Sequence, residues 1–97
     1  MTDHLQEGIY AGKQIFTFGH GQDNFPGYVV VWGQDSVDCR RLMTKYYGDK
    51  WSMQYPSEEA AGVKQFGLVL RAVISERGGW EEKSGRAWDS KEANNEM

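Results

Sequence analysis

Residues 28–32 (YVVVW) are the most strand-like stretch of the chain, because they consist only of β-branched and aromatic residues. A run that is apolar on both faces is typical of a strand in the middle of a sheet. Residues 13–18 (KQIFTF) are also rich in such residues and predict a second strand. Glycines and Pro26 punctuate the connection 19–27, so we expect an antiparallel hairpin with a long loop.

One main helix is predicted after this hairpin. It begins at a capping residue, Asp35 or Ser36, and ends at Gly48, which suits a left-handed position. One apolar stripe repeats with the helical period, and its members are Cys39, Leu42, Met43, Tyr46 and Tyr47. Cys39 is the only cysteine, so we read it as a small buried residue in a protein of a reducing compartment.

The remaining elements are shorter. Residues 51–55 (WSMQY) alternate between apolar and polar and predict a half-exposed strand, with Met53 packed against the helix. Residues 57–61 begin with a capping serine and two carboxylates, which favours a short helix. Residues 68–74 (LVLRAVI) fit a strand or a short helix, and the pattern leaves both open. The predicted order is therefore β-β-α-β-(α)-β.

The length of 97 residues predicts one domain. We expect an α+β fold in which a small antiparallel sheet is backed by one main helix. Residues 1–12 are interpreted as a polar leader and residues 13–75 as the domain. Residues 76–97 are rich in charges and poor in apolar side chains, so they are interpreted as a polar, flexible C-terminal tail. Trp80 and Trp88 within that tail either dock on the domain or on a second copy, or are disordered.

Charge and hydropathy exclude several classes of protein. The net charge of −3 argues against a protein whose main partner is nucleic acid, so we expect no stable nucleic-acid binding. No apolar run approaches the ~20 residues of a membrane span, and the polar, acidic N-terminus does not resemble a signal peptide. We therefore expect a cytoplasmic protein without a membrane partner.

No known catalytic or metal-binding motif occurs in the chain. His4 and His20 are the only histidines, which is too few for a histidine-rich metal site. Neither a nucleophile elbow nor a phosphate-binding P-loop motif is found. We therefore expect no catalytic residues, no metal and no cofactor, and a protein that is not an enzyme.

Two clusters are candidates for ligand binding. The loop Gly19-His20-Gly21-Gln22 alternates glycine with polar residues, and its backbone N–H groups can converge on an anion while His20 and Gln22 read a base or phosphate. The alternative is that this loop is a wide turn without a binding role. The second cluster combines rings with polar and basic groups and suits a stacked nucleobase. Its rings are Tyr28, Trp32, Trp51 and Tyr55, and its polar and basic residues are Gln54, Arg40, Arg41, Lys45 and Lys50. Of these, the expected ligand contacts are Tyr28, Arg40, Arg41, Lys50, Trp51 and Gln54. The alternative for Trp51 is packing against the helix.

Three segments together carry a resemblance to small phage-encoded proteins: FTFGxGQ at residues 16–22, GYVVV at residues 27–31 and YGDKWSMQY at residues 47–55. The resemblance covers roughly residues 13–70. Some proteins of this kind are similar to the Thoeris anti-defence proteins of phages, which sequester cyclic ADP-ribose-type immune messengers. The resemblance implies a non-enzymatic, oligomeric sponge with aromatic and basic pockets, and it assigns no individual ligand residue.

Three functions remain from the sequence. The first is a phage-type counter-defence protein, in the host cytoplasm, that sequesters a nucleotide-derived messenger as a homo-oligomer. The second is an anti-CRISPR-like inhibitor that binds a host defence protein, which the acidity of the chain would favour. The third is an enzyme that acts on a nucleotide ligand.

Overall fold

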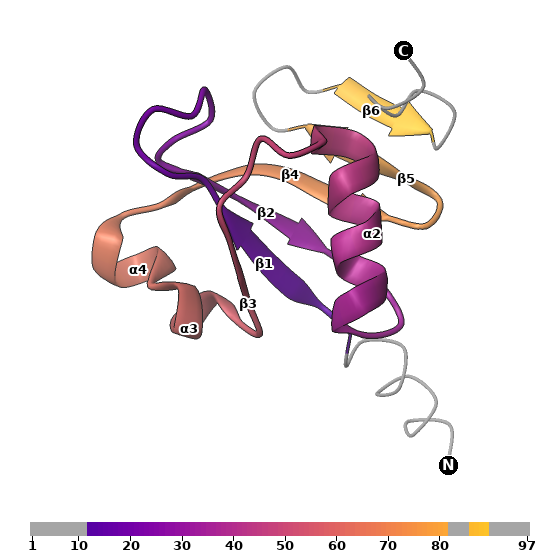
Figure 1. Cartoon of the computed structure of the whole chain (residues 1–97), viewed down its shortest axis with the longest axis horizontal. Helices are drawn as coiled ribbons and strands as arrows, with labels where there is room; N and C mark the ends of the chain where they lie inside the picture. The colour runs from indigo at the N-terminus through magenta and orange to yellow at the C-terminus, as the bar shows by residue number, and fades with distance from the viewer. Residues whose placement is uncertain (1–11, 82–85, 90–97) are drawn as a thin grey trace.

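The computed structural model describes residues 12–81 and 86–89 of the chain (Figure 1). One sheet and one long helix dominate the fold, together with two single-turn helices. In chain order the elements are β1 (Gln14–Thr17), β2 (Gly27–Val31), α2 (Ser36–Tyr47), β3 (Met53–Tyr55), α3 (Glu58–Ala61), α4 (Val63–Phe66), β4 (Val69–Ser75), β5 (Gly78–Glu81) and β6 (Arg86–Asp89).

The strands form one mixed sheet in the order β3-β1-β2-β4-β5-β6. β2 lies between β1 and β4, as its two apolar faces predict. The β1–β2 pair is the expected antiparallel hairpin, with Ile15 opposite Val30. Residues 68–74, which the sequence left open, belong to a strand, since β4 spans Val69–Ser75. The α+β fold class is thus confirmed.

Helix α2 covers one face of the sheet (Figure 1). Asp35 caps it by accepting a hydrogen bond from the backbone N–H of Asp38, and Gly48 ends it with φ of 62°. The predicted stripe faces the sheet, where α2 and strand side chains make the main core: Phe16, Phe18, Val29, Val31, Cys39, Leu42, Met43, Tyr46, Ala72 and Ile74. Among the described residues, no helix has the length and apolar character that crossing a membrane requires.

A smaller cluster lies on the opposite face of the sheet. Ile15 and Val30 are buried there against Ala61 of α3. The helices α3 and α4 cover this face only in part, so its other members are half-buried: Tyr28, Trp32, Tyr55, Val63, Leu70 and Val73. Trp80 of β5 pairs with Val73 and therefore lies on this same face.

The sheet differs from the expected antiparallel one because β2 and β4 are parallel. A parallel pair needs a long crossover connection, and the segment from α2 through α4 supplies it. The expected domain end at residue 75 was also too early. Residues 78–81 pair with β4 and residues 86–89 pair with β5, so the flexible-tail prediction is wrong for these residues. Of the expected leader, residues 1–11 lie outside the described part, as does the side chain of Trp88.

The alternation in residues 51–55 was misleading. Trp51 precedes β3 and packs on the α2 side, whereas Met53 lies on the opposite side and is 53% exposed. The prediction that Met53 packs against the helix was therefore wrong. The reason is that the pairing of β3 with β1 begins at Met53, which lies opposite Thr17 and on the same face of the sheet. Trp51 precedes this pairing, so the alternation of faces along a strand does not apply to it.

Candidate functional site

A hollow lies on the sheet face opposite α2, at the carboxyl end of β4. Trp32, which follows β2, and Trp80 of β5 both line it, and its volume is about 350 Å³. Val73 lies between them as the register partner of Trp80. Ser75 and Gly78 pair with each other on the same face and are small, so they leave the space beside Trp32 unfilled. We call this site the indole hollow.

The two tryptophans are held differently. The backbone N–H of Trp32 donates to Ile74 O at 2.8 Å, and Lys13 Nζ lies 5.5 Å from the centroid of the Trp32 ring. Trp32 is half-buried, whereas Trp80 is 39% exposed. A large aromatic side chain with that exposure beside a hollow is well suited to contact a planar ligand.

A second hollow adjoins the first and is larger, at about 690 Å³. It lies between the first turns of α2 and the turn that joins β4 to β5, and we call it the α2 groove. Its lining residues are Trp32, Gly33, Gln34, Asp38, Arg41, Ser75, Glu76 and Arg77. Trp32, Ser75 and Arg77 line both hollows, so the two form one continuous site. The site sits beyond the carboxyl ends of the parallel strands β2 and β4, where α/β sheets commonly bind ligands.

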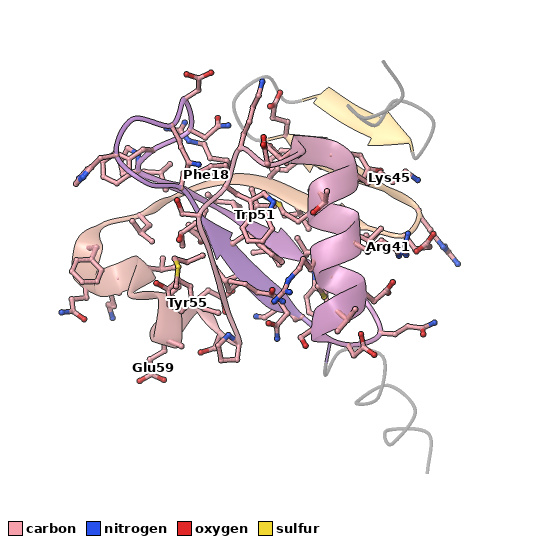
Figure 2. The ribbon with its side chains drawn as sticks, viewed as in Figure 1. Phe18, Arg41, Lys45, Trp51, Tyr55 and Glu59 are labelled. Carbon is pink, nitrogen blue, oxygen red and sulfur yellow. The ribbon has the colours of Figure 1, made fainter. Side chains whose placement is uncertain are left out.

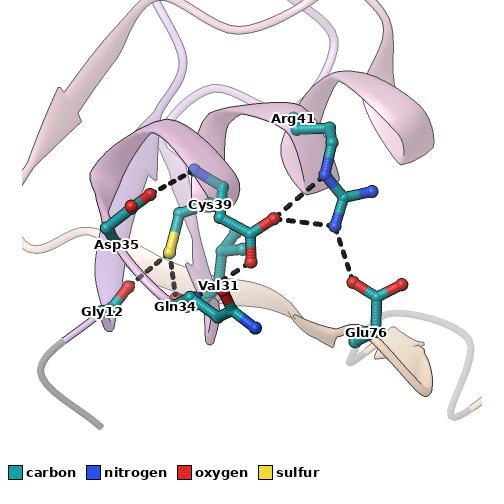
Figure 3. Close-up of polar contacts among 8 residues, drawn as sticks. Gly12, Val31, Gln34, Asp35, Cys39, Arg41 and Glu76 are labelled. Atoms are coloured by element: carbon teal, nitrogen blue, oxygen red, sulfur yellow. Dashed lines mark hydrogen bonds and ion pairs between the residues drawn. The ribbon is translucent and has the colours of Figure 1, made fainter. Parts of the chain in front are cut away.

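The polar wall of the α2 groove is an ion-pair network centred on Arg41 (Figure 3). Its Nε and Nη2 donate to Asp38 Oδ1 at 2.9 and 2.7 Å, and Nη2 also donates to Glu76 Oε1 at 2.6 Å. Asp38 Oδ2 accepts from the backbone N–H of Gln34. That hydrogen bond, followed by the one from Arg41, lowers the pKa of Asp38, while the two carboxylates raise the pKa of Arg41. Asp38 therefore stabilises the fold at neutral pH, and this contribution is lost as the pH falls through its lowered pKa.

Arg77 adds a second cation at the junction of the two hollows. It forms no ion pair with any acidic side chain of residues 12–81. Its backbone N–H donates to Ser75 Oγ at 3.3 Å, which fixes the turn. Gly78 follows with φ of 140°, a conformation that favours glycine. The turn thus holds the Arg77 guanidinium beside the indole hollow.

The eight residues expected to bind a ligand do not form one site. Arg41 is the only one of them in the α2 groove. His20 and Gln22 are in the β1–β2 loop, where the His20 ring contacts Phe25 at 4.2 Å between centroids. Gln22 Oε1 accepts hydrogen bonds from the backbone N–H of Gly19 and from Ser52 Oγ, so it closes the loop.

Four others lie on the α2 side of the sheet. Arg40 Nε donates to Gln54 Oε1 at 3.0 Å, and Lys50 is exposed after α2. Trp51 is half-buried against the main core, with its ring edge-on to Phe16 at 4.8 Å and its Nε1 donating to Gly48 O (Figure 2). Its packing against the helix is the alternative that the sequence offered. Tyr28 lies on the opposite face.

Sequence reasoning missed Arg77 and Trp80 as ligand contacts. It counted Trp32 among the rings of the second cluster but did not select it as a contact. The segment 75–79 (SERGG) contains the pattern of a hairpin turn, two polar residues followed by glycine. Recognising that turn would have placed Trp80 on a strand beside β4 rather than in a tail.

The described residues outside these hollows include neither a reactive thiol nor a metal-binding cluster. Cys39 is buried and its Sγ donates to Gly12 O and Val31 O, while desolvation raises its pKa to about 11. A thiol with that pKa stays protonated at neutral pH and is a poor nucleophile. Within residues 12–81, no cluster of three or more His, Cys, Asp and Glu side chains could hold a metal ion.

Comparison with known proteins found no family model that matches the chain, no matching curated protein and no matching solved structure. The chemistry of the indole hollow and the α2 groove is therefore the basis for a functional proposal.

Proposed function

We propose that the protein binds a small nucleotide-type ligand at the indole hollow and the α2 groove, without transforming it. The observation that carries this proposal is the continuity of the two hollows around Trp32, with an aromatic wall on one side and arginines on the other. A nucleotide has the same two parts, a planar base and an anionic phosphate. Together the hollows have the size usual for a small-molecule site.

The chemistry of each part supports this division. Indole rings stack on nucleobases, and such stacking tolerates any base because every base has a flat face. Arginine binds phosphate through paired N–H groups, and both Arg41 and Arg77 line the groove. We therefore place the base beside Trp32 and Trp80, and the phosphate at the arginines.

The carboxylates of the groove support binding over hydrolysis. Among the described residues, Asp38 and Glu76 are the only acidic side chains that line it, and both are hydrogen-bonded to Arg41. The pKa of Asp38 is lowered by its hydrogen bonds, which makes this carboxylate a weak general base near neutral pH. The proposed activity is therefore sequestration of an intact ligand.

The biological role that we propose is phage-type counter-defence in the host cytoplasm, by removal of a nucleotide-derived immune messenger. It rests on the resemblance to phage-encoded proteins. We also propose a homo-oligomer, because the indole hollow is shallow and a second copy would deepen it. The runner-up is an inhibitor that binds a host defence protein, for which the net charge of −3 is the support.

Isothermal titration with cyclic ADP-ribose isomers and cyclic dinucleotides tests the binding proposal. We expect one of these ligands to bind with a micromolar or lower dissociation constant. Native mass spectrometry of protein purified from defence-induced cells should show an oligomer that carries the same ligand at its unmodified mass. Silence across the whole panel would overturn the proposal, and a stoichiometric host protein retained in a pull-down would favour the runner-up.

A further inference from the structure

We propose that Glu76 is a built-in competitor of the ligand's phosphate for Arg41. A phosphate that enters the α2 groove binds the Arg41 guanidinium in place of the Glu76 carboxylate, so Glu76 determines how strongly a phosphorylated ligand is preferred. This inference rests on the proposed function, because it concerns the same site. It adds the residue that controls selectivity and predicts a ligand whose phosphate contacts Arg41.

The charges that line the groove balance. Among the described lining residues, Arg41 and Arg77 are offset by Asp38 and Glu76, so these four side chains offer no net positive charge to an anion. Arg41 already has two carboxylate partners, at 2.7 and 2.6 Å. These contacts occupy Nε and Nη2 of Arg41, so a phosphate gains the contact with Nη2 only if Glu76 leaves.

The two carboxylates are not equally fixed. Asp38 lies in the first turn of α2, is 21% exposed, and also accepts a hydrogen bond from the backbone N–H of Gln34. Glu76 lies in the β4–β5 turn, is 68% exposed, and contacts Arg41 through one oxygen only (Figure 3). Glu76 is consequently the carboxylate that can be displaced, whereas Asp38 keeps Arg41 oriented.

Displacement of Glu76 is also favourable on electrostatic grounds. An exposed ion pair is weak because water and salt screen it. A phosphate with up to two negative charges and three acceptor oxygens binds a guanidinium more strongly than a single carboxylate does. The released Glu76 side chain remains in solvent, so its displacement leaves no buried charge.

A purely structural role for Glu76 makes a different prediction. If the ion pair only joins α2 to the β4–β5 turn, replacing Glu76 should lower stability slightly and leave ligand selectivity unchanged. If Glu76 competes with phosphate, its replacement should strengthen the binding of phosphorylated ligands alone. The two roles are therefore separated by comparing one nucleoside with and without its phosphate.

The test is isothermal titration of the full chain with AMP and with adenosine, for the wild type, Glu76→Gln and Glu59→Gln. Glu59 is an exposed carboxylate of α3 that lines neither hollow, so it controls for the change in net charge (Figure 2). We expect Glu76→Gln to tighten AMP binding about fivefold or more. Adenosine binding should not change, and Glu59→Gln should match the wild type.

An equal effect of Glu76→Gln and Glu59→Gln on AMP binding would overturn the inference, and so would equal tightening for AMP and adenosine. Failure of both the wild type and Glu76→Gln to bind AMP would overturn it as well. In that case the proposed function would still be decided by the panel of cyclic nucleotides, so the two failures are distinguishable.

Discussion

Replacing Trp51 with alanine is expected to lower the free energy of unfolding by about 3 kcal/mol. The Trp51 ring packs edge-on against the fully buried Phe16 and adjoins the core beneath α2. Its removal leaves a cavity beside Phe16 and leaves Gly48 O without the hydrogen bond from the indole Nε1. Chemical denaturation followed by circular dichroism measures the loss.

Trp80→Ala is the matched control for this experiment, because it removes the same side chain from a site that is 39% exposed. We expect it to cost less than about 1 kcal/mol of stability. Trp51→Phe should recover part of the stability by keeping a ring against Phe16. A Trp51→Ala variant as stable as the wild type would show that Trp51 is not part of the core.

The same two variants should have the opposite order of effects on ligand binding, with the larger loss in Trp80→Ala. Trp80→Ala is expected to weaken nucleotide binding about fivefold or more, because stacking on an aromatic side chain contributes about 1–3 kcal/mol for each base. Isothermal titration measures the change in dissociation constant, and Trp80→Phe should restore part of the affinity.

Trp51→Ala should retain the wild-type dissociation constant at temperatures where it remains folded, because Trp51 is on the opposite face of the sheet. Loss of binding in Trp51→Ala together with full binding in Trp80→Ala would place the ligand on the α2 side, near Arg40 and Gln54. That result would contradict the assignment of the site to the indole hollow.

Local patterns were enough to predict the hairpin and the main helix. Residues 28–32 are apolar on both faces because β2 has α2 on one side and α3 on the other. The apolar residues of α2 from Cys39 to Tyr46 repeat with the helical period, and their side chains are all buried against the sheet. In both cases the burial of each side chain depends on its own element, so the sequence pattern records it.

Features that depend on contacts between distant segments were not predictable in this way. β5 contains Gly78 and Gly79, and it is held by backbone pairing with β4, so it has little apolar pattern of its own. The parallel pairing of β2 with β4 depends on the path of the chain through α2, α3 and α4. Neither feature leaves a periodic trace in the sequence.

The candidate site also depends on contacts between segments that are distant in the sequence. Trp32, Arg41 and Trp80 come from a loop, a helix and a strand that meet only after β4 has paired with both β2 and β5. The sequence suggested the right kinds of side chain, rings beside basic groups. It selected Trp51 over Trp32 because the alternation in residues 51–55 implied a strand face that the sheet does not form.

The most direct test of a nucleotide site around Trp32 is NMR titration of the ¹⁵N-labelled protein with each nucleotide of the panel. Each tryptophan gives one indole N–H signal, which reports on the surroundings of its own ring. We predict that the signals of Trp32 and Trp80 shift with ligand concentration while that of Trp51, donated to Gly48 O, stays in place. Binding that moves the Trp51 signal and leaves Trp32 and Trp80 unchanged would contradict the proposed site.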